Sequence, residues 1–267
     1  MLKPIISADS HVAEPPDTYA GRIDSKFKDR APKMVHDERR GDMFLIEGSK
    51  QPIPLALVSA VGKAPEELSP RGAVWDKLHK GGWNSEARIE AQEQDGVAAE
   101  ILYPSVGMEI CNIPDLDLKH ACMQAYNRWL QDMTSEAPDR ILGLAQTAVL
   151  SVDGAIEDFR RAKEMGMVGI MMPGDAIHED YDHRDYDALW ECAVDLNLPV
   201  CFHILTSNDY DAATALKSPR GHQANAFMNL VRGVQDILGL FVFGGVFERH
   251  PDLHMVVAEA DAGWVPH

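Results

Sequence analysis

This chain of 267 residues has few cysteines, fewer basic than acidic residues and no long apolar run. No stretch approaches the roughly 20 apolar residues that span a bilayer, and the N-terminus lacks the apolar core of a secretory signal. No Cys-x-x-Cys pair is present, so we expect reduced, buried thiols and a cytoplasmic protein. The four cysteines are Cys111, Cys122, Cys192 and Cys201.

Lysine and arginine total 25 against 42 aspartates and glutamates, which gives a net charge of −17. Nucleic acids and anionic membranes attract basic surfaces, so neither is an expected partner. Apolar residues make up 45% of the chain, enough for a large core, and a single α/β barrel needs about 250 residues. We therefore expect one domain over residues 1–267.

Apolar strands and helical segments alternate after Trp83. Such alternation is typical of a parallel sheet with both faces covered, either a barrel or a doubly wound sheet. No Gly-x-Gly-x-x-Gly or Walker-type loop follows a strand, which favours a TIM-like (β/α) barrel of the α/β class. A complete barrel has eight strands, and the sequence indicates about six. Strands are predicted from Ile5 and at 98–103, 141–150, 167–172, 198–205 and 254–259; helices at 84–94, 116–137, 152–165, 186–197 and 224–249.

Residues 15–82 break this pattern. The segment is rich in proline, glycine and charged residues, and we interpret it as a long loop or small subdomain inserted after the first strand. A connection of this length in a compact domain is usually functional, as a lid, an oligomer contact or a determinant of substrate choice.

Two predicted strands end in groups that bind metals. Asp9 and His11 lie two residues apart, so their side chains project from one face of the first strand. His203 ends the strand that begins at Leu198. A carboxylate and imidazoles suit one borderline divalent cation, zinc or manganese. Taken alone, Asp9 is more commonly a turn acceptor and His203 a hydrogen-bonded core residue.

The order of motifs along the chain resembles the amidohydrolase-related family. The opening Asp-x-His-x-x-Glu-Pro carries the first part of this resemblance, and further matches cover nearly the whole chain. The family consists of metal-dependent TIM-barrel enzymes that include the aminocarboxymuconate-semialdehyde and resorcylate-type decarboxylases. The matching segments are 9–15, 95–104, 126–130, 138–140, 161–170, 198–203 and 244–253.

The resemblance implies that Asp9, His11 and His203 are metal ligands. In the family a histidine at the end of the sixth strand often handles protons, but this chain has none there. Glu259 is the nearest candidate for that catalytic role, and Asp261 is the second. No segment supplies the last two strands or the aspartate of the eighth, so the chain resembles a family member truncated at its C-terminus.

Two further residues have open assignments. Glu14 is either an acceptor behind a metal ligand or part of the turn at Pro15. His222, one loop beyond His203, is a candidate for substrate contact.

The resemblance implies an enzyme that acts on a small-molecule carboxylate through one divalent metal ion. The favoured reaction is non-oxidative decarboxylation. The alternatives are hydrolysis of an ester, lactone or amide, with or without metal, and a catalytically inert barrel. We also expect a homo-oligomer, because an open sheet edge favours association with another chain.

Overall fold

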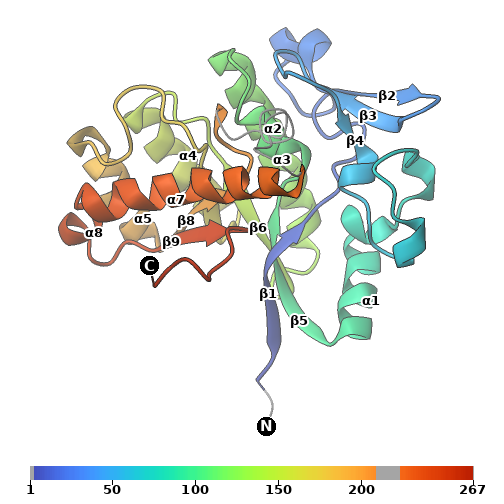
Figure 1. The fold of residues 1–267 in the computed structure, drawn as a ribbon. Helices are drawn as coiled ribbons and strands as arrows, with labels where there is room; N and C mark the ends of the chain where they lie inside the picture. The colour runs from blue at the N-terminus through green and yellow to red at the C-terminus, as the bar shows by residue number, and fades with distance from the viewer. Residues whose placement is uncertain (1–2, 209–222, 267) are drawn as a thin grey trace. The chain divides into compact units, whose positions relative to one another are not determined.

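The computed structural model describes residues 3–208 and 223–266. The chain divides into two compact units, Met1–Leu144 and Ala145–His267, and parallel strands alternate with helices in both (Figure 1). The predicted α/β, TIM-like fold with six strands of a partial barrel is confirmed. Within the described residues, no helix is long and apolar enough to cross a membrane.

The first unit is built on parallel strands. These are β1 (Ile5–His11), β5 (Val97–Tyr103) and β6 (Ile141–Gln146), and the unit boundary falls within β6. β1 pairs with β5 so that Ser10 lies opposite Leu102 and His11 opposite Tyr103, and β5 pairs in turn with β6. β6 is shorter than predicted, because Val149 has a positive φ of 52° that strands do not adopt.

Three helices accompany these strands: α1 (Ser85–Asp95), α2 (Val106–Ile110) and α3 (Leu116–Ser135). The helix predicted at 84–94 begins after Asn84, whose side chain accepts a hydrogen bond from the Ala87 backbone N–H at 2.8 Å. It ends at Gly96, which has the left-handed φ of 69°. α2 was not predicted, since five residues are too few to show a helical period.

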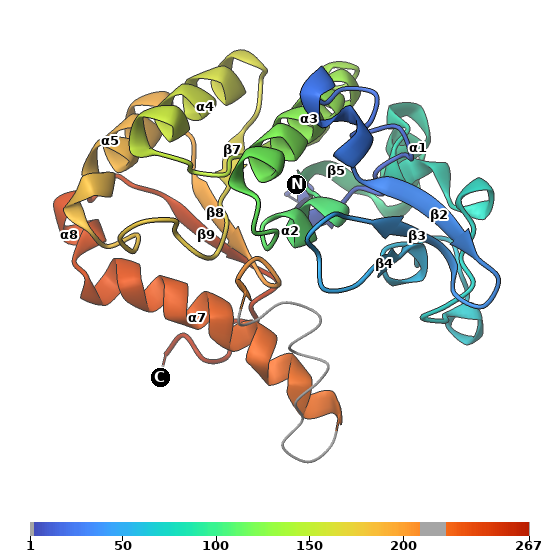
Figure 2. The same cartoon turned by 90° about the horizontal axis from the view of Figure 1, so that it is seen from above.

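The inserted segment is a small subdomain with its own antiparallel sheet. Its strands are β2 (Lys33–Asp37), β3 (Gly41–Leu45) and β4 (Ile53–Pro54), paired in the order β2–β3–β4 (Figure 2). Asp37 closes the β2–β3 turn by accepting the N–H groups of Arg39 and Arg40. Short 3₁₀ helices fill the rest: η1 (Ser25–Arg30), η2 (Leu55–Leu57), η3 (Pro65–Glu67), η4 (Trp75–Lys77) and η5 (Lys80–Gly82).

The second unit places helices around three parallel strands, as Figure 2 shows. The strands pair in the order β7–β8–β9, with His203 opposite Ala258. They are β7 (Gly169–Met171), β8 (Val200–His203) and β9 (Met255–Ala258); the helices are α4 (Val152–Glu164), η6 (Arg184–Tyr186), α5 (Asp187–Leu196), η8 (Gln223–Ala226), α7 (Phe227–Phe243) and α8 (Val246–Arg249).

A cluster of buried aromatic rings fixes β8 against these helices. Phe202 of β8 lies 5.7 Å from Phe241 of α7 and 5.5 Å from Tyr181, measured between ring centroids. Trp190 of α5 lies 5.1 Å from Phe241. Each of these four residues is completely buried. Because Phe202 precedes His203, this packing also fixes the position of that histidine.

The predicted helical stretch 224–249 is divided in two at Gly244 and Gly245. A Cβ atom on Gly244 would lie 2.3 Å from the Cβ of Asp182, and Gly245 has a φ of 71°. Close packing and a left-handed backbone therefore require glycine at these positions. The four cysteines are buried, as predicted, and no disulfide joins them within the described residues.

Candidate metal centre

The carboxyl end of β1 presents Asp9 and His11 on one face. Both side chains are about 70% buried, and His11 Nε2 lies 3.5 Å from Asp9 Oδ1. Ser10, between them, points to the opposite face, where its hydroxyl donates to Glu100 at 3.1 Å. Because side chains alternate between the two faces of a strand, the candidate ligands lie on the face opposite a second polar network.

The ring of His11 is fixed by a backbone carbonyl. His11 Nδ1 lies 3.0 Å from the carbonyl oxygen of Pro104. A carbonyl can only accept a hydrogen bond, so Nδ1 carries the proton and Nε2 of the neutral ring keeps its lone pair. A second partner of this kind is typical of histidines that bind metals through the other nitrogen.

Glu14 holds the loop that contains Pro104. Its carboxylate is 1% exposed and accepts the backbone N–H groups of Ser105 at 3.0 Å and Gly107 at 3.1 Å. Burial raises the pKa of Glu14, and the backbone donors oppose that increase only in part. The Ser105 hydroxyl donates to the Val12 carbonyl at 2.6 Å. Glu14 therefore lies behind the His11 ring contact and is not a simple turn residue.

The second unit repeats this arrangement at the end of β8. The His203 side chain is fully buried, and its Nδ1 lies 3.0 Å from the carbonyl oxygen of Ile204. Its Nε2 therefore carries the lone pair of the neutral ring and is the candidate ligand atom. The hydroxyl of Thr206 donates to the His203 carbonyl at 2.8 Å and holds the backbone in place.

Glu259 approaches His203 from the residue after β9. Its Oε2 lies 3.4 Å from His203 Nε2, and 55% of its side chain is exposed. Glu259 has a φ of 54°, a left-handed conformation that side chains rarely adopt and that occurs disproportionately at functional sites. Asp261, the second candidate, instead accepts the N–H groups of Ala262 and Gly263, which lower its pKa.

The separations in these two pairs fit ligand atoms better than hydrogen bonds. Two atoms that each lie about 2.1 Å from a tetrahedral ion are about 3.4 Å apart. The pairs His11–Asp9 and His203–Glu259 measure 3.5 and 3.4 Å. By contrast, the His36–Asp42 and His250–Asp187 pairs are hydrogen bonds of 2.7 and 3.0 Å. The exposed His183–Asp185 pair is also 3.4 Å apart, but there His183 Nδ1 already accepts the backbone N–H of Asp185 at the start of η6.

Several other cysteine and histidine side chains can be placed in the structure. Cys201 and His250 are buried, and His250 binds Asp187 as a packing residue. His178 and His254 are exposed. His222 lies outside the described residues. Sequence reasoning did not identify the carbonyls of Pro104 and Ile204, since every residue carries a carbonyl and no side chain marks these two.

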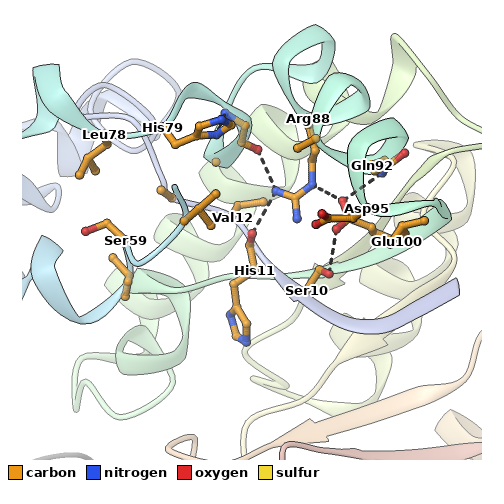
Figure 3. Close-up of a pocket in the computed structure, with 17 residues that line it drawn as sticks. Ser10, His11, Val12, Ser59, Leu78, His79, Arg88, Gln92, Asp95 and Glu100 are labelled. Carbon is orange, nitrogen blue, oxygen red and sulfur yellow. Dashed lines mark hydrogen bonds and ion pairs between the residues drawn. The ribbon is translucent and has the colours of Figure 1, made fainter. Parts of the chain in front are cut away.

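A cavity of about 280 Å³ lies in the first unit beside α1 (Figure 3). Arg88 enters it from α1 and donates to Glu100 at 2.6 Å and to the His11 carbonyl at 3.0 Å. Burial opposes ionisation of Glu100, but hydrogen bonds from Gln92, Arg88 and Ser10 outweigh it and lower the Glu100 pKa. The His11 ring points away from Arg88 (Figure 3), so this network lies behind the candidate ligand.

Comparison with known proteins identifies the class. The parallel strands, helices and strand-end histidines define an α/β protein with a TIM-like fold. Residues 83–266 match the profile of the Amidohydrolase family. The chain therefore belongs to the amidohydrolase family.

Solved structures share this fold at low sequence identity. An amidohydrolase from Mycobacterium avium subsp. paratuberculosis is 21% identical with a TM-score of 0.76, and the match covers 100% of this chain and 74% of that one. A 2,6-dihydroxybenzoate decarboxylase from Rhizobium is 15% identical (TM-score 0.56; 96% and 66%). A 5-carboxyvanillate decarboxylase from Novosphingobium aromaticivorans, solved with manganese, is 18% identical (TM-score 0.53; 96% and 64%). The chain thus spans about two thirds of either decarboxylase.

Proposed function

We propose that the chain belongs to a metal-dependent enzyme that decarboxylates a small carboxylic acid without oxidation. In this proposal Asp9, His11 and His203 bind one divalent cation, zinc or manganese, and Glu259 transfers protons. The observation that carries it is the paired arrangement of the histidines. Each has Nδ1 on a backbone carbonyl and Nε2 at 3.4–3.5 Å from a carboxylate oxygen.

The solved relatives support the choice of reaction. Two of them are decarboxylases of aromatic acids, and one of these was solved with manganese. The carboxylate of Asp9 and the imidazoles of His11 and His203 form a mixed oxygen and nitrogen donor set that suits either zinc or manganese. We therefore propose an aromatic or unsaturated carboxylic acid as substrate.

The chain's own residues have defined tasks in this reaction. A bound divalent cation would supply Lewis acidity toward the substrate carboxylate. The carbonyls of Pro104 and Ile204 keep both Nε2 atoms unprotonated and available. Glu259 is exposed enough to exchange protons with water, and it delivers one to the carbon that bears the carboxylate. The carbon–carbon bond then breaks, CO₂ leaves and the proton takes its place.

Hydrolysis is the second candidate. It is favoured by the amidohydrolase from Mycobacterium avium, which has the higher TM-score and coverage among these three structures. The same residues would serve, with Glu259 accepting a proton from the attacking water. The substrate would then be an ester, lactone or amide.

Location and assembly are part of the proposal. Four buried cysteines that form no disulfide among the described residues suit a reducing compartment, which supports the cytoplasm. A homo-oligomer remains a prediction, and light scattering of the purified protein would test it.

The test measures bound metal and product together. The protein is purified without added metal, loaded with Mn²⁺ or Zn²⁺ and analysed by mass spectrometry for metal per chain. CO₂ release from hydroxybenzoates is then compared with hydrolysis of esters and lactones. We expect about one ion per chain, with loss of metal and activity in His203→Ala and Asp9→Asn. If His203→Ala does not fold because a buried side chain is removed, Asp9→Asn still tests the ligand assignment.

His36→Ala is the matched control, because it removes a histidine–aspartate pair elsewhere in the first unit. It should keep both metal and activity. Full metal content in His203→Ala would disprove the ligand assignment. A folded wild-type chain that binds no metal and turns over no substrate would support the inert interpretation instead.

A further inference from the structure

Arg88 forms a three-way contact behind His11. From α1 its Nη1 donates to the carbonyl of His11 at 3.0 Å and to the carbonyl of Gly81 at 2.9 Å. Its Nε donates to Glu100 Oε2 at 2.6 Å. Only 9% of the side chain is exposed, so these contacts are largely shielded from water.

The same region binds the following residues of the chain. The Ala13 N–H donates to the Gly82 carbonyl at 2.9 Å, and the Val12 N–H donates to the Tyr103 carbonyl at 3.1 Å. The end of β1 is therefore held by β5 on one side and by the segment from η5 to α1 on the other. Arg88 supplies the bond to the carbonyl of the candidate ligand itself.

Glu100 is the side-chain partner of Arg88. It accepts from Arg88 at 2.6 Å, from Gln92 at 3.0 Å and, through its other oxygen, from the Ser10 hydroxyl at 3.1 Å. Ser10 lies between the two candidate ligands of β1. Figure 3 shows Arg88, Glu100 and Ser10 as one connected group, with the His11 ring directed away from it.

We propose that Arg88 is a positioning residue that holds the backbone of His11 so that its ring stays on the Pro104 carbonyl and Nε2 keeps the lone pair that would bind the metal. This inference rests on the proposed metal site. Because His11 Nδ1 and the Pro104 carbonyl are 3.0 Å apart, a small shift of the His11 backbone would lengthen that bond beyond hydrogen-bonding distance. Partners behind a ligand commonly contribute 10- to 100-fold to metal affinity, roughly the effect expected here.

The adjoining cavity offers a direct rescue experiment. It is lined by Arg88, His11 and Glu100 and measures about 280 Å³, so a small planar cation can reach the place of a deleted guanidinium. Arg88→Ala should bind Mn²⁺ about 10- to 100-fold more weakly than wild type. Millimolar guanidinium should restore the affinity, whereas ethylammonium, which lacks the planar fork of donors, should not.

Metal-free protein gives a second, independent readout. With ¹⁵N-labelled histidine, long-range NMR correlations report which ring nitrogen of His11 is protonated, and the spectrum of His11→Asn assigns the signal. Wild type should show protonated Nδ1, and Arg88→Ala should show exchange between tautomers. This readout tests Arg88 even if the wild-type chain binds no metal, an outcome that would overturn only the proposed function.

Further variants separate positioning from a general loss of structure. Arg88→Met combined with Glu100→Gln avoids an unpaired buried carboxylate and should still show the altered His11 signal. Glu100→Gln alone keeps the bond from Arg88 to His11 and should behave as wild type. Arg140→Met is the matched control, since Arg140 also binds a strand carbonyl, that of Val97. A wild-type His11 signal in the folded double variant would overturn the proposal.

Discussion

Replacement of Glu14 is a sensitive test of the loop that supports the His11 ring. In Glu14→Ala the backbone N–H groups of Ser105 and Gly107 lose their acceptor inside a region with almost no water access. An unsatisfied buried donor costs about 1–3 kcal/mol, so the two together should lower the free energy of unfolding by about 2–6 kcal/mol. Glu14→Gln keeps an acceptor of the same shape and should cost about 1 kcal/mol at low pH.

The pH dependence distinguishes a buried carboxylate from a buried amide. Because burial raises the folded-state pKa of Glu14 above 4.5, the folded chain retains a proton that the unfolded chain has lost. The contribution of Glu14 to the free energy of unfolding is therefore fully present below pH 4.5 and decreases as pH rises to the folded-state pKa. The slope is about 1.4 kcal/mol per pH unit across that window. Glu14→Gln cannot titrate, so its stability relative to wild type should increase at that slope.

Urea titrations of wild type, Glu14→Gln and Glu14→Ala between pH 4 and 8 measure these differences. Glu93→Gln serves as a control, since Glu93 is an exposed partner of Arg140. A difference between Glu14→Gln and wild type that stays constant across this range would refute the burial argument. Equal stability of Glu14→Ala and wild type would show that the two N–H groups find other acceptors.

Two predictions concern the second unit. Burial opposes ionisation of Asp187, but hydrogen bonds from His250 and Arg249 outweigh it and lower the Asp187 pKa. The contribution of this residue to the free energy of unfolding is therefore present above pH 3.8 and is lost as pH falls through the folded-state pKa. Asp187→Asn should therefore cost about 1–2 kcal/mol at pH 7 and less in acid, and thermal unfolding at several pH values measures this; an equal cost at all pH values would contradict it. Phe241→Ala should cost about 3–5 kcal/mol in chemical denaturation because it leaves a cavity among buried rings. Phe243→Ala, at a residue 92% exposed, is its control, and a similar cost for both would contradict the packing argument.

Short-range signals made much of the fold predictable. Asn84 and Gly96 mark the two ends of α1 because a cap contacts only the adjacent turn. The apolar run at 200–203 is a strand whose four side chains are all buried, as expected when both faces of a strand are covered, whereas in the strand at 255–258 Val256 is exposed. The subdomain sheet β2–β3–β4 was not predicted, since its strands are short and their apolar and polar residues do not alternate regularly.

The candidate site was predictable only in its side chains. Asp9, His11, His203 and Glu259 were recognised from their places at strand ends and from the family resemblance, and the structure pairs Asp9 with His11 and His203 with Glu259. The contact of Arg88 is not visible in the sequence, because its partner is a backbone carbonyl 77 residues away in the chain.

The sequence by itself determined the alternation of strands and helices, the ends of α1, and the Asp-x-His pair at the end of β1. These features depend on periodicity and neighbouring residues, which a linear pattern records. The tertiary structure decided which nitrogen of each histidine keeps its lone pair. That choice depends on the carbonyls of Pro104 and Ile204, and the first lies 93 residues from His11. Backbone groups are the same in every residue, so only folding determines which of them meets a ring.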